Sequence, residues 1–161
     1  MANSRVRAVG GAEPGHGGVA ELFRLWREPM ARLAYVLTSD SSRSDEIVQD
    51  AFLQLHANWA RVDNPVGYLR TAVVNGCRSH HRHLAVVRRA PVDRESVADL
   101  ATNELGDAVA RLDYPYRAAL ALRYLCDLPD DEIAVALGIR PATVRTRIRR
   151  ALIKLRKEIE R

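Results

Sequence analysis

The sequence predicts an all-α protein made of two small helical domains joined by a flexible linker. Apolar residues recur at intervals of three and four in several separate stretches, which is the period of one helix face. No alternation of apolar and polar residues is long enough to predict a strand. Residues 89–103 contain Pro91 and three acidic residues with little periodicity, which is typical of a segment between domains.

The chain begins with a stretch that lacks large apolar residues. Residues 1–18 contain five of the nine glycines, together with Pro14, and we expect them to form a disordered leader. From Val19 onward, a helical stripe runs along the chain. It consists of Leu22, Phe23, Trp26, Met30, Leu33, Ala34 and Leu37. Pro29 is expected to break or kink this helix, because proline removes a backbone hydrogen bond in a helix interior.

Two further helices complete the predicted N-terminal domain, residues 19–88. One starts at the serine-rich turn 41–44 and has acidic residues in its first turn. Its apolar side carries Ile47, Val48, Ala51, Phe52, Leu55 and Trp59. The next has Asp63 and Asn64 as candidate caps and Pro65 at its first position, and its stripe continues from Val66 toward the late 80s.

The C-terminal domain, residues 104–161, contains the pattern of a helix-turn-helix. Helices are expected from Asn103 to Leu112, from Pro115 to Leu125, and at 130–137 and 141–158. Gly138 lies where a left-handed residue is needed between the last two. In the last helix the predicted buried stripe is Val144, Ile148, Leu152 and Leu155, which leaves Thr143, Arg145, Thr146, Arg149 and Arg150 on the other sides.

This last helix has the composition of a DNA-reading helix. Arginine pairs bidentately with guanine in the major groove, and threonine contacts a phosphate or a thymine methyl group. The alternatives are an ordinary helical hairpin and a basic helix on a membrane surface, although the exposed side lacks bulky apolar residues that insert into lipid.

The distribution of charge supports a nucleic-acid partner better than its total. The 161 residues carry a formal net charge of +5, which decides little by itself. No acidic residue occurs between Asp63 and Asp93 or between Glu132 and Glu158, so each domain has one acid-free basic helix. A solvated basic surface is the alternative for either stretch alone.

Several other classes of protein are not indicated. No apolar run could span a bilayer and the N-terminus has no signal-peptide core, so a cytoplasmic protein without membrane insertion is expected. Cys77 and Cys126 have no metal-site spacing and are expected to be buried thiols. The histidine cluster at 80, 81 and 83 has no neighbouring carboxylate or cysteine. Histidines that are partly cationic beside a phosphate chain are favoured instead, and no metal, cofactor or catalytic residue is expected.

The order of these features resembles a known family over residues 19–158. The motifs are Asp45-Glu46-Ile47-Val48-Gln49-Asp50-Ala51-Phe52, Asn64-Pro65-Val66-Gly67-Tyr68-Leu69-Arg70, Val74-Asn75 and Thr143-Val144-Arg145-Thr146-Arg147-Ile148. Together they resemble the extracytoplasmic-function (ECF) sigma factors of bacterial RNA polymerase, and most closely the actinobacterial SigE-like group. In one departure, the chain has Leu128-Pro129-Asp130 where the family usually has a serine cap, so Pro129 or Asp130 must cap that helix.

The resemblance implies partners and site residues. Residues 19–88 would be sigma region 2 and residues 104–161 sigma region 4. The partners would be core RNA polymerase, through its β′ clamp and β flap, promoter DNA, and an anti-sigma factor as a further candidate. Polymerase binding would fall on Gln49, Asp50 and Leu53. Reading of the −10 element would fall on Arg61, Asp63, Asn64, Thr71, Asn75, Arg78, Ser79 and Arg82. The −35 element would be read by Thr143, Arg145, Thr146, Arg149 and Arg150.

Two other functions fit parts of the sequence. A free-standing helix-turn-helix regulator would bind duplex DNA as a dimer and use the N-terminal domain for dimerisation or ligand sensing. A histidine-dependent metal nuclease would use the cluster at 80–83. Asp50 could also be an ordinary solvated helix residue, but the exposed Leu53 expected beside it favours a partner surface. No extra regulatory domain is suggested after Arg161.

Overall fold

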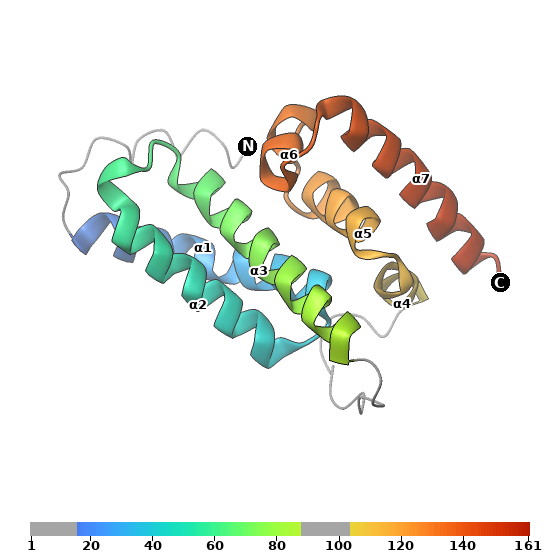
Figure 1. Ribbon diagram of the computed structural model, residues 1–161, viewed down its shortest axis with the longest axis horizontal. Helices are drawn as coiled ribbons and strands as arrows, with labels where there is room; N and C mark the ends of the chain where they lie inside the picture. The colour runs from blue at the N-terminus through green and yellow to red at the C-terminus, as the bar shows by residue number, and fades with distance from the viewer. Residues whose placement is uncertain (1–15, 88–103) are drawn as a thin grey trace.

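The computed structural model describes residues 16–87 and 104–161. Within these ranges every regular element is helical, and the helices form two groups, an N-terminal bundle (α1–α3) and a C-terminal domain (α4–α7) (Figure 1). The predicted all-α class is confirmed. The predictions for residues 1–15 and for most of the linker, 89–103, lie outside the described residues. In the described part of the chain, no helix is long and apolar enough to cross a membrane.

The first helix is one continuous element, so the predicted break at Pro29 is wrong. Helix α1 spans His16–Thr38 with Pro29 in its interior. Pro29 is exposed, and so is Leu25, whose carbonyl loses its helical partner. Water can hydrate that carbonyl, while Met30 and Leu33 anchor the helix on its buried side.

Helix α1 also starts earlier than predicted. The leader was expected to run to residue 18, yet residues 16–18 are helical. Gly18 is buried against the indole of Trp59, and a Cβ at position 18 would lie 2.5 Å from its Cζ2. The absence of a side chain therefore allows the first turn of α1 to approach the far end of α2.

The other two bundle helices begin with side-chain caps. Helix α2 spans Ser41–Asn58, and the carboxylate of Asp40 accepts a hydrogen bond of 2.9 Å from the amide of Arg43. A short 3₁₀ turn, Trp59–Arg61, follows. Helix α3 spans Pro65–Val87, and Oδ1 of Asn64 accepts from the amide of Gly67 at 3.0 Å, as the sequence predicted. Each cap fixes where its helix begins.

The C-terminal domain contains the predicted helix-turn-helix. Helices α4 (Glu104–Arg111) and α5 (Tyr114–Leu120) come first, and α5 ends in a π-helical segment, Ala121–Leu125. Helix α6 spans Asp130–Leu137 and α7 spans Pro141–Ile159. Gly138 lies between them with φ 64° and ψ 38°, the left-handed conformation expected for it.

Two local details of this domain differ from or settle the expectations. Pro129 is the N-cap residue of α6 and makes no side-chain cap hydrogen bond. The predicted buried position Leu152 on α7 is wrong, because it is 42% exposed and the fully buried residue beside it is Ala151. Helix α7 packs on α4, α5 and α6, so its contact stripe passes through a small residue where the helices approach closely.

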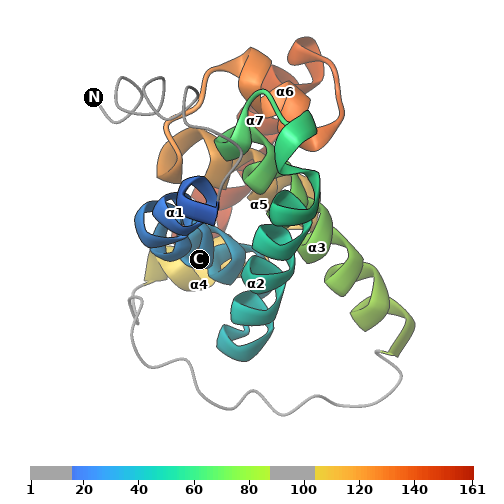
Figure 2. The same ribbon diagram turned by 90° about the vertical axis from the view of Figure 1, so that its left-hand side faces the viewer.

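The two domains pack directly against each other. Helix α3 contacts α5 and α6, while α1 contacts α5 and the π-helical segment. Figure 1 shows α5 between α3 and α7, and Figure 2 shows α1 and α3 in front of the C-terminal domain. One continuous apolar core includes Leu33 and Val74 of the bundle together with Leu122 and Ile133 of the C-terminal domain.

Candidate nucleic-acid and partner-binding surfaces

Helix α3 presents three different faces. Its core face carries Val66, Leu69, Val73 and Cys77, all buried. The face that looks toward the C-terminal domain is described below. The third face carries the predicted −10 residues, of which Asn75, Ser79 and Arg82 are exposed and Thr71 is half-buried. This polar, acid-free face lies opposite the core, as the helical period predicted.

The loop before α3 continues the polar surface. Arg61, Asp63 and Asn64 are all exposed. The side-chain oxygen of Asn64 is occupied by its cap hydrogen bond, which leaves its amide NH₂ group as the part free to contact a ligand. The loop therefore offers a cation, a carboxylate and an amide donor at one end of α3.

Arg78 is the predicted −10 residue that the structure does not leave free. Its Nη2 donates to the carbonyl of Leu137, the last residue of α6, at 3.2 Å. Its Nη1 lies 3.5 Å from Oδ1 of Asn75. The guanidinium is thus held at the contact between the two domains rather than pointing only to solvent.

The histidine cluster of α3 faces inward more than the sequence suggested. His80 is buried, and burial together with the cation of Arg43 lowers its pKa, so this ring is neutral at pH 7. The ring of His81 hydrogen-bonds with the carbonyl of Leu37 at the end of α1 and packs on Tyr114. The expectation of cationic histidines beside a phosphate chain is therefore wrong for His80. The described residues contain no group of three or more residues that could hold a metal ion.

On α2, the predicted partner surface is exposed. Gln49, Asp50 and Leu53 point away from the core, whose neighbouring members Val48 and Phe52 are buried. Leu53 is 61% exposed, which is a high value for a leucine between core positions. An apolar side chain next to an unburied carboxylate is a suitable anchor for a partner protein.

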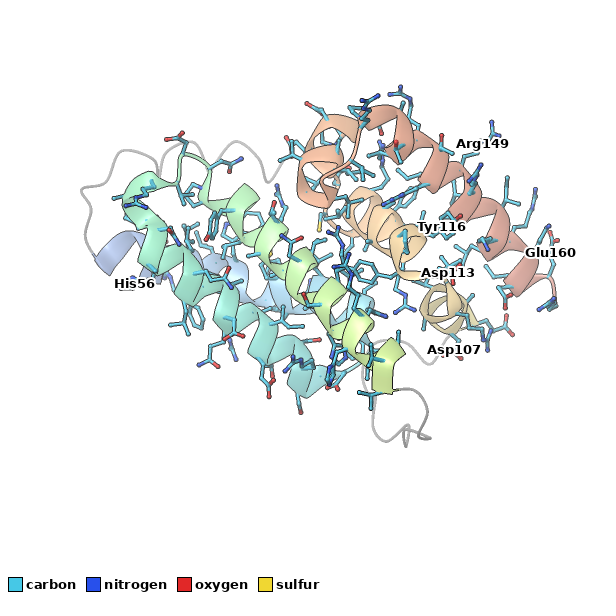
Figure 3. All side chains as sticks on the ribbon, in the orientation of Figure 1. His56, Asp107, Asp113, Tyr116, Arg149 and Glu160 are labelled. Atoms are coloured by element: carbon cyan, nitrogen blue, oxygen red, sulfur yellow. The ribbon has the colours of Figure 1, made fainter. Side chains whose placement is uncertain are left out.

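The recognition helix α7 carries its predicted DNA residues along one exposed side. Arg149 is exposed and has no ion-pair partner within the described residues (Figure 3). Arg145 lies 3.4 Å from Oδ2 of Asp130, and the same carboxylate also pairs with Arg123. The hydroxyl of Thr146 donates to the carbonyl of Ala142 at 3.1 Å. Arg149 is therefore the predicted residue most available to a ligand.

A shallow basic cavity of about 330 Å³ lies between α7 and the start of α5. It is lined by Thr143, Thr146 and Arg150, which the sequence predicted, and also by Arg147 and Tyr116, which it did not. Figure 3 shows Asp113 and Tyr116 near α7. Lys154 closes one side, with Nζ 5.3 Å from the ring centre of Tyr116 and 3.8 Å from Oδ2 of Asp113. Arg147 belongs to the basic motif of α7, but no local pattern points to Tyr116.

Both cysteines are free thiols. Cys77 is buried, and burial raises its pKa to about 12. Cys126 is half-buried rather than fully buried, and burial raises its pKa as well. A thiol with a raised pKa is a poor nucleophile, so neither residue has the environment of a catalytic cysteine.

Comparisons with known proteins agree with this division into two domains. Residues 22–86 match the family model "Sigma-70 region 2", and residues 102–155 match "Sigma-70, region 4". These are the polymerase and promoter-binding regions of the sigma-70 class of transcription initiation factors.

Full-length relatives narrow the class. The chain is 32% identical over 145 residues to the ECF RNA polymerase sigma factor SigM of Mycobacterium tuberculosis, covering 84% of this chain and 74% of that protein. It is 25% identical over 150 residues to an RNA polymerase sigma-E factor of Streptomyces coelicolor, covering 86% and 84%. The chain belongs to the ECF family of RNA polymerase sigma factors, which direct promoter recognition and transcription initiation.

Solved structures show the same fold. The sigma factor RpoE of Bartonella quintana, in complex with the anti-sigma factor NepR, matches with a TM-score of 0.72 at 18% identity, over 88% of this chain and 96% of that chain. CnrH, in complex with the cytosolic domain of CnrY, matches with a TM-score of 0.68 at 20% identity, over 96% and 93%.

Proposed function

We propose that this sigma factor binds core RNA polymerase through the exposed face of α2 and positions its two basic helices on the two promoter elements. Residues 19–88 would hold the β′ clamp and read the −10 element, and residues 104–161 would contact the β flap and read the −35 element. The observation that carries this division is that α3 and α7 each combine a buried apolar stripe with an acid-free polar face.

On the bundle, Gln49, Asp50 and Leu53 are the proposed polymerase contacts. The −10 surface would be the loop and outer face of α3, formed by Arg61, Asp63, Asn64, Thr71, Asn75, Arg78, Ser79 and Arg82. Promoter melting extrudes a base at a cost of a few kcal/mol of stacking, and a polar pocket with a cationic rim offsets that cost. Arginines and amides in this loop and on α3 supply those groups.

On the C-terminal domain, α7 would enter the major groove at the −35 element. Arg145, Arg149 and Arg150 are the proposed base or phosphate contacts, and Thr143 and Thr146 would contribute smaller contacts. The absence of acidic side chains from Ile133 to Lys157 keeps phosphate repulsion low on this side.

We also propose a subgroup and a cellular context. The relatives from Streptomyces coelicolor, Streptomyces avermitilis and Streptomyces antibioticus, all sigma-E factors at 24–26% identity, support membership of the SigE-like group. The protein would perform no chemistry itself, because the polymerase catalyses RNA synthesis, and it would act with the polymerase in the cytoplasm. An anti-sigma factor is a further proposed partner, as for the two similar structures.

The test combines core polymerase, the purified chain and a promoter library. Co-elution of the chain with core enzyme, followed by sequencing of transcript starts, should yield one promoter class with shared −35 and −10 sequences. Failure to co-elute would reject the polymerase assignment. Tight, specific duplex binding in the absence of polymerase would instead support a free-standing regulator.

A further inference from the structure

The contact between the two domains is built from side chains of one domain and main-chain carbonyls of the other. The hydroxyl of Tyr114 donates to the carbonyl of Val74 at 2.7 Å. Nη1 of Arg117 donates to the carbonyl of Leu37 at 3.2 Å, and Arg78 donates to Leu137 as described above. The carbonyls of Leu37 and Leu137 lie at the C-terminal ends of α1 and α6, where helix carbonyls lack a helical partner and favour cations.

This contact is dry and includes buried charge. Arg117 is 6% exposed, and it also donates to the carbonyls of Ala110 and Leu112 at the end of α4. Arg70 is 8% exposed, and its Nη1 lies 3.6 Å from Oε2 of Glu132 on α6. Buried guanidinium groups are costly unless they are hydrogen-bonded, so these geometries define one specific closed arrangement.

The closed arrangement is too short for both promoter elements, an argument that rests on the proposed function. Elements centred near −35 and −10 are about 25 base pairs apart, or roughly 85 Å along the duplex at about 3.4 Å per pair. A compact chain of this length has a radius of gyration of about 15 Å, hence a diameter of roughly 40 Å. The segment 88–103 could extend to about 55 Å, so separation of the domains can supply the missing reach.

We propose that the interface between the bundle and the C-terminal domain is an autoinhibitory latch that keeps the free protein closed until core polymerase separates the domains. Tyr114 and Arg117 are its main bolts from the C-terminal side. Arg78 has two successive roles, because it holds α6 in the closed form and joins the −10 surface once released. Closure therefore withholds a DNA contact as well as limiting reach.

The two native cysteines can report opening. The charge of Cys77 affects the pKa of Tyr114, and that of Arg70 affects the pKa of Cys126, so both thiols lie close to latch residues. Cys77 is fully buried, and with its raised pKa it reacts slowly while the latch is closed. The rate of alkylation of each cysteine, followed by peptide mass spectrometry at pH 8, measures how often the interface opens.

The test variant is Tyr114→Phe, which removes only the hydroxyl that crosses the interface. Loss of one such hydrogen bond should raise the alkylation rate of both cysteines by about two- to tenfold. Tyr116→Phe is the matched control, because Tyr116 lies two residues away on α5 and faces α7. Glu132→Gln, which weakens the ion pair with Arg70, is the second variant should Tyr114→Phe fail to fold.

Two further arms separate opening from unfolding and from failure of the proposed function. Core polymerase should accelerate alkylation of the wild-type chain, whereas global unfolding would be suppressed by binding. At limiting sigma factor, Tyr114→Phe should give up to about tenfold more transcript than wild type, and the same amount at saturation. Unchanged alkylation in both latch variants, or no added transcription, would overturn the latch. A chain that never binds core polymerase would reject the proposed function, while the alkylation arm still decides whether the interface is a latch.

Discussion

Replacement of Arg149 by alanine should remove most of the discrimination that the protein makes at the −35 element. Arg149 is exposed on α7 and has no ion pair to break within the described residues before it binds DNA. A bidentate arginine contact to guanine contributes about 1–3 kcal/mol of discrimination. The preference of the holoenzyme for its own −35 sequence over a scrambled one should therefore fall by about five- to 150-fold.

The neighbouring Arg145 should matter less, for a reason visible in the structure. Its guanidinium already pairs with Asp130 at 3.4 Å, and such an exposed pair contributes about 0.2–1 kcal/mol. That amount is lost when Arg145 turns to DNA, so Arg145→Ala should reduce discrimination by a smaller factor than Arg149→Ala. Asp130→Asn should narrow the difference between the two.

The assay is competition between the two promoter duplexes for holoenzyme at one fixed salt concentration. Arg156→Ala is the matched control, because Arg156 is exposed on the same helix two turns further on and pairs with Glu160. An equal loss of affinity for both duplexes in Arg149→Ala would refute base reading and leave only a phosphate contact. An unchanged affinity for both would refute the assignment of α7 as the reading helix.

Three further outcomes are expected. Asp50→Ala should weaken binding to core polymerase by at least about tenfold with an unchanged thermal unfolding temperature, whereas Asp45→Ala, exposed on another side of α2, should not; titration with labelled core enzyme compares them. Gly138→Ala should lower the free energy of unfolding by about 1 kcal/mol through its positive φ alone, because nothing lies within 4 Å of the added Cβ, and Gly138→Asn should cost less in urea denaturation. Asn64→Ala should cost about 0.5–2 kcal/mol by removing the cap of α3, and an unchanged urea midpoint would contradict that role.

Most of the helical elements were predictable from the sequence because their signals are local. The apolar period located the helices, and Asn64, Pro65 and Gly138 marked ends where the backbone has few alternatives. The error at Pro29 arose from treating the lost hydrogen bond as decisive. In the structure that loss lies on the solvent side, where water satisfies the carbonyl and the buried side keeps the helix straight enough to pack.

The contact between the domains was not predictable from local patterns. Arg70, Arg78 and Arg117 have the sequence signature of surface cations, yet each is buried or half-buried against a carbonyl or carboxylate from a distant segment. Periodicity assigns a residue to a face of its own helix, but it does not say whether a second domain covers that face. The same limit applies to Leu152, whose exposure depends on how α7 crosses its neighbours.

The contact between Gly18 and Trp59 has a consequence for how this family of chains can vary. Because a Cβ at position 18 would come within 2.5 Å of the indole, any larger residue there requires a smaller side chain at position 59. The two positions should therefore change together during evolution, although they lie on different helices. Paired substitution at 18 and 59 in sequenced relatives would be a record of this contact.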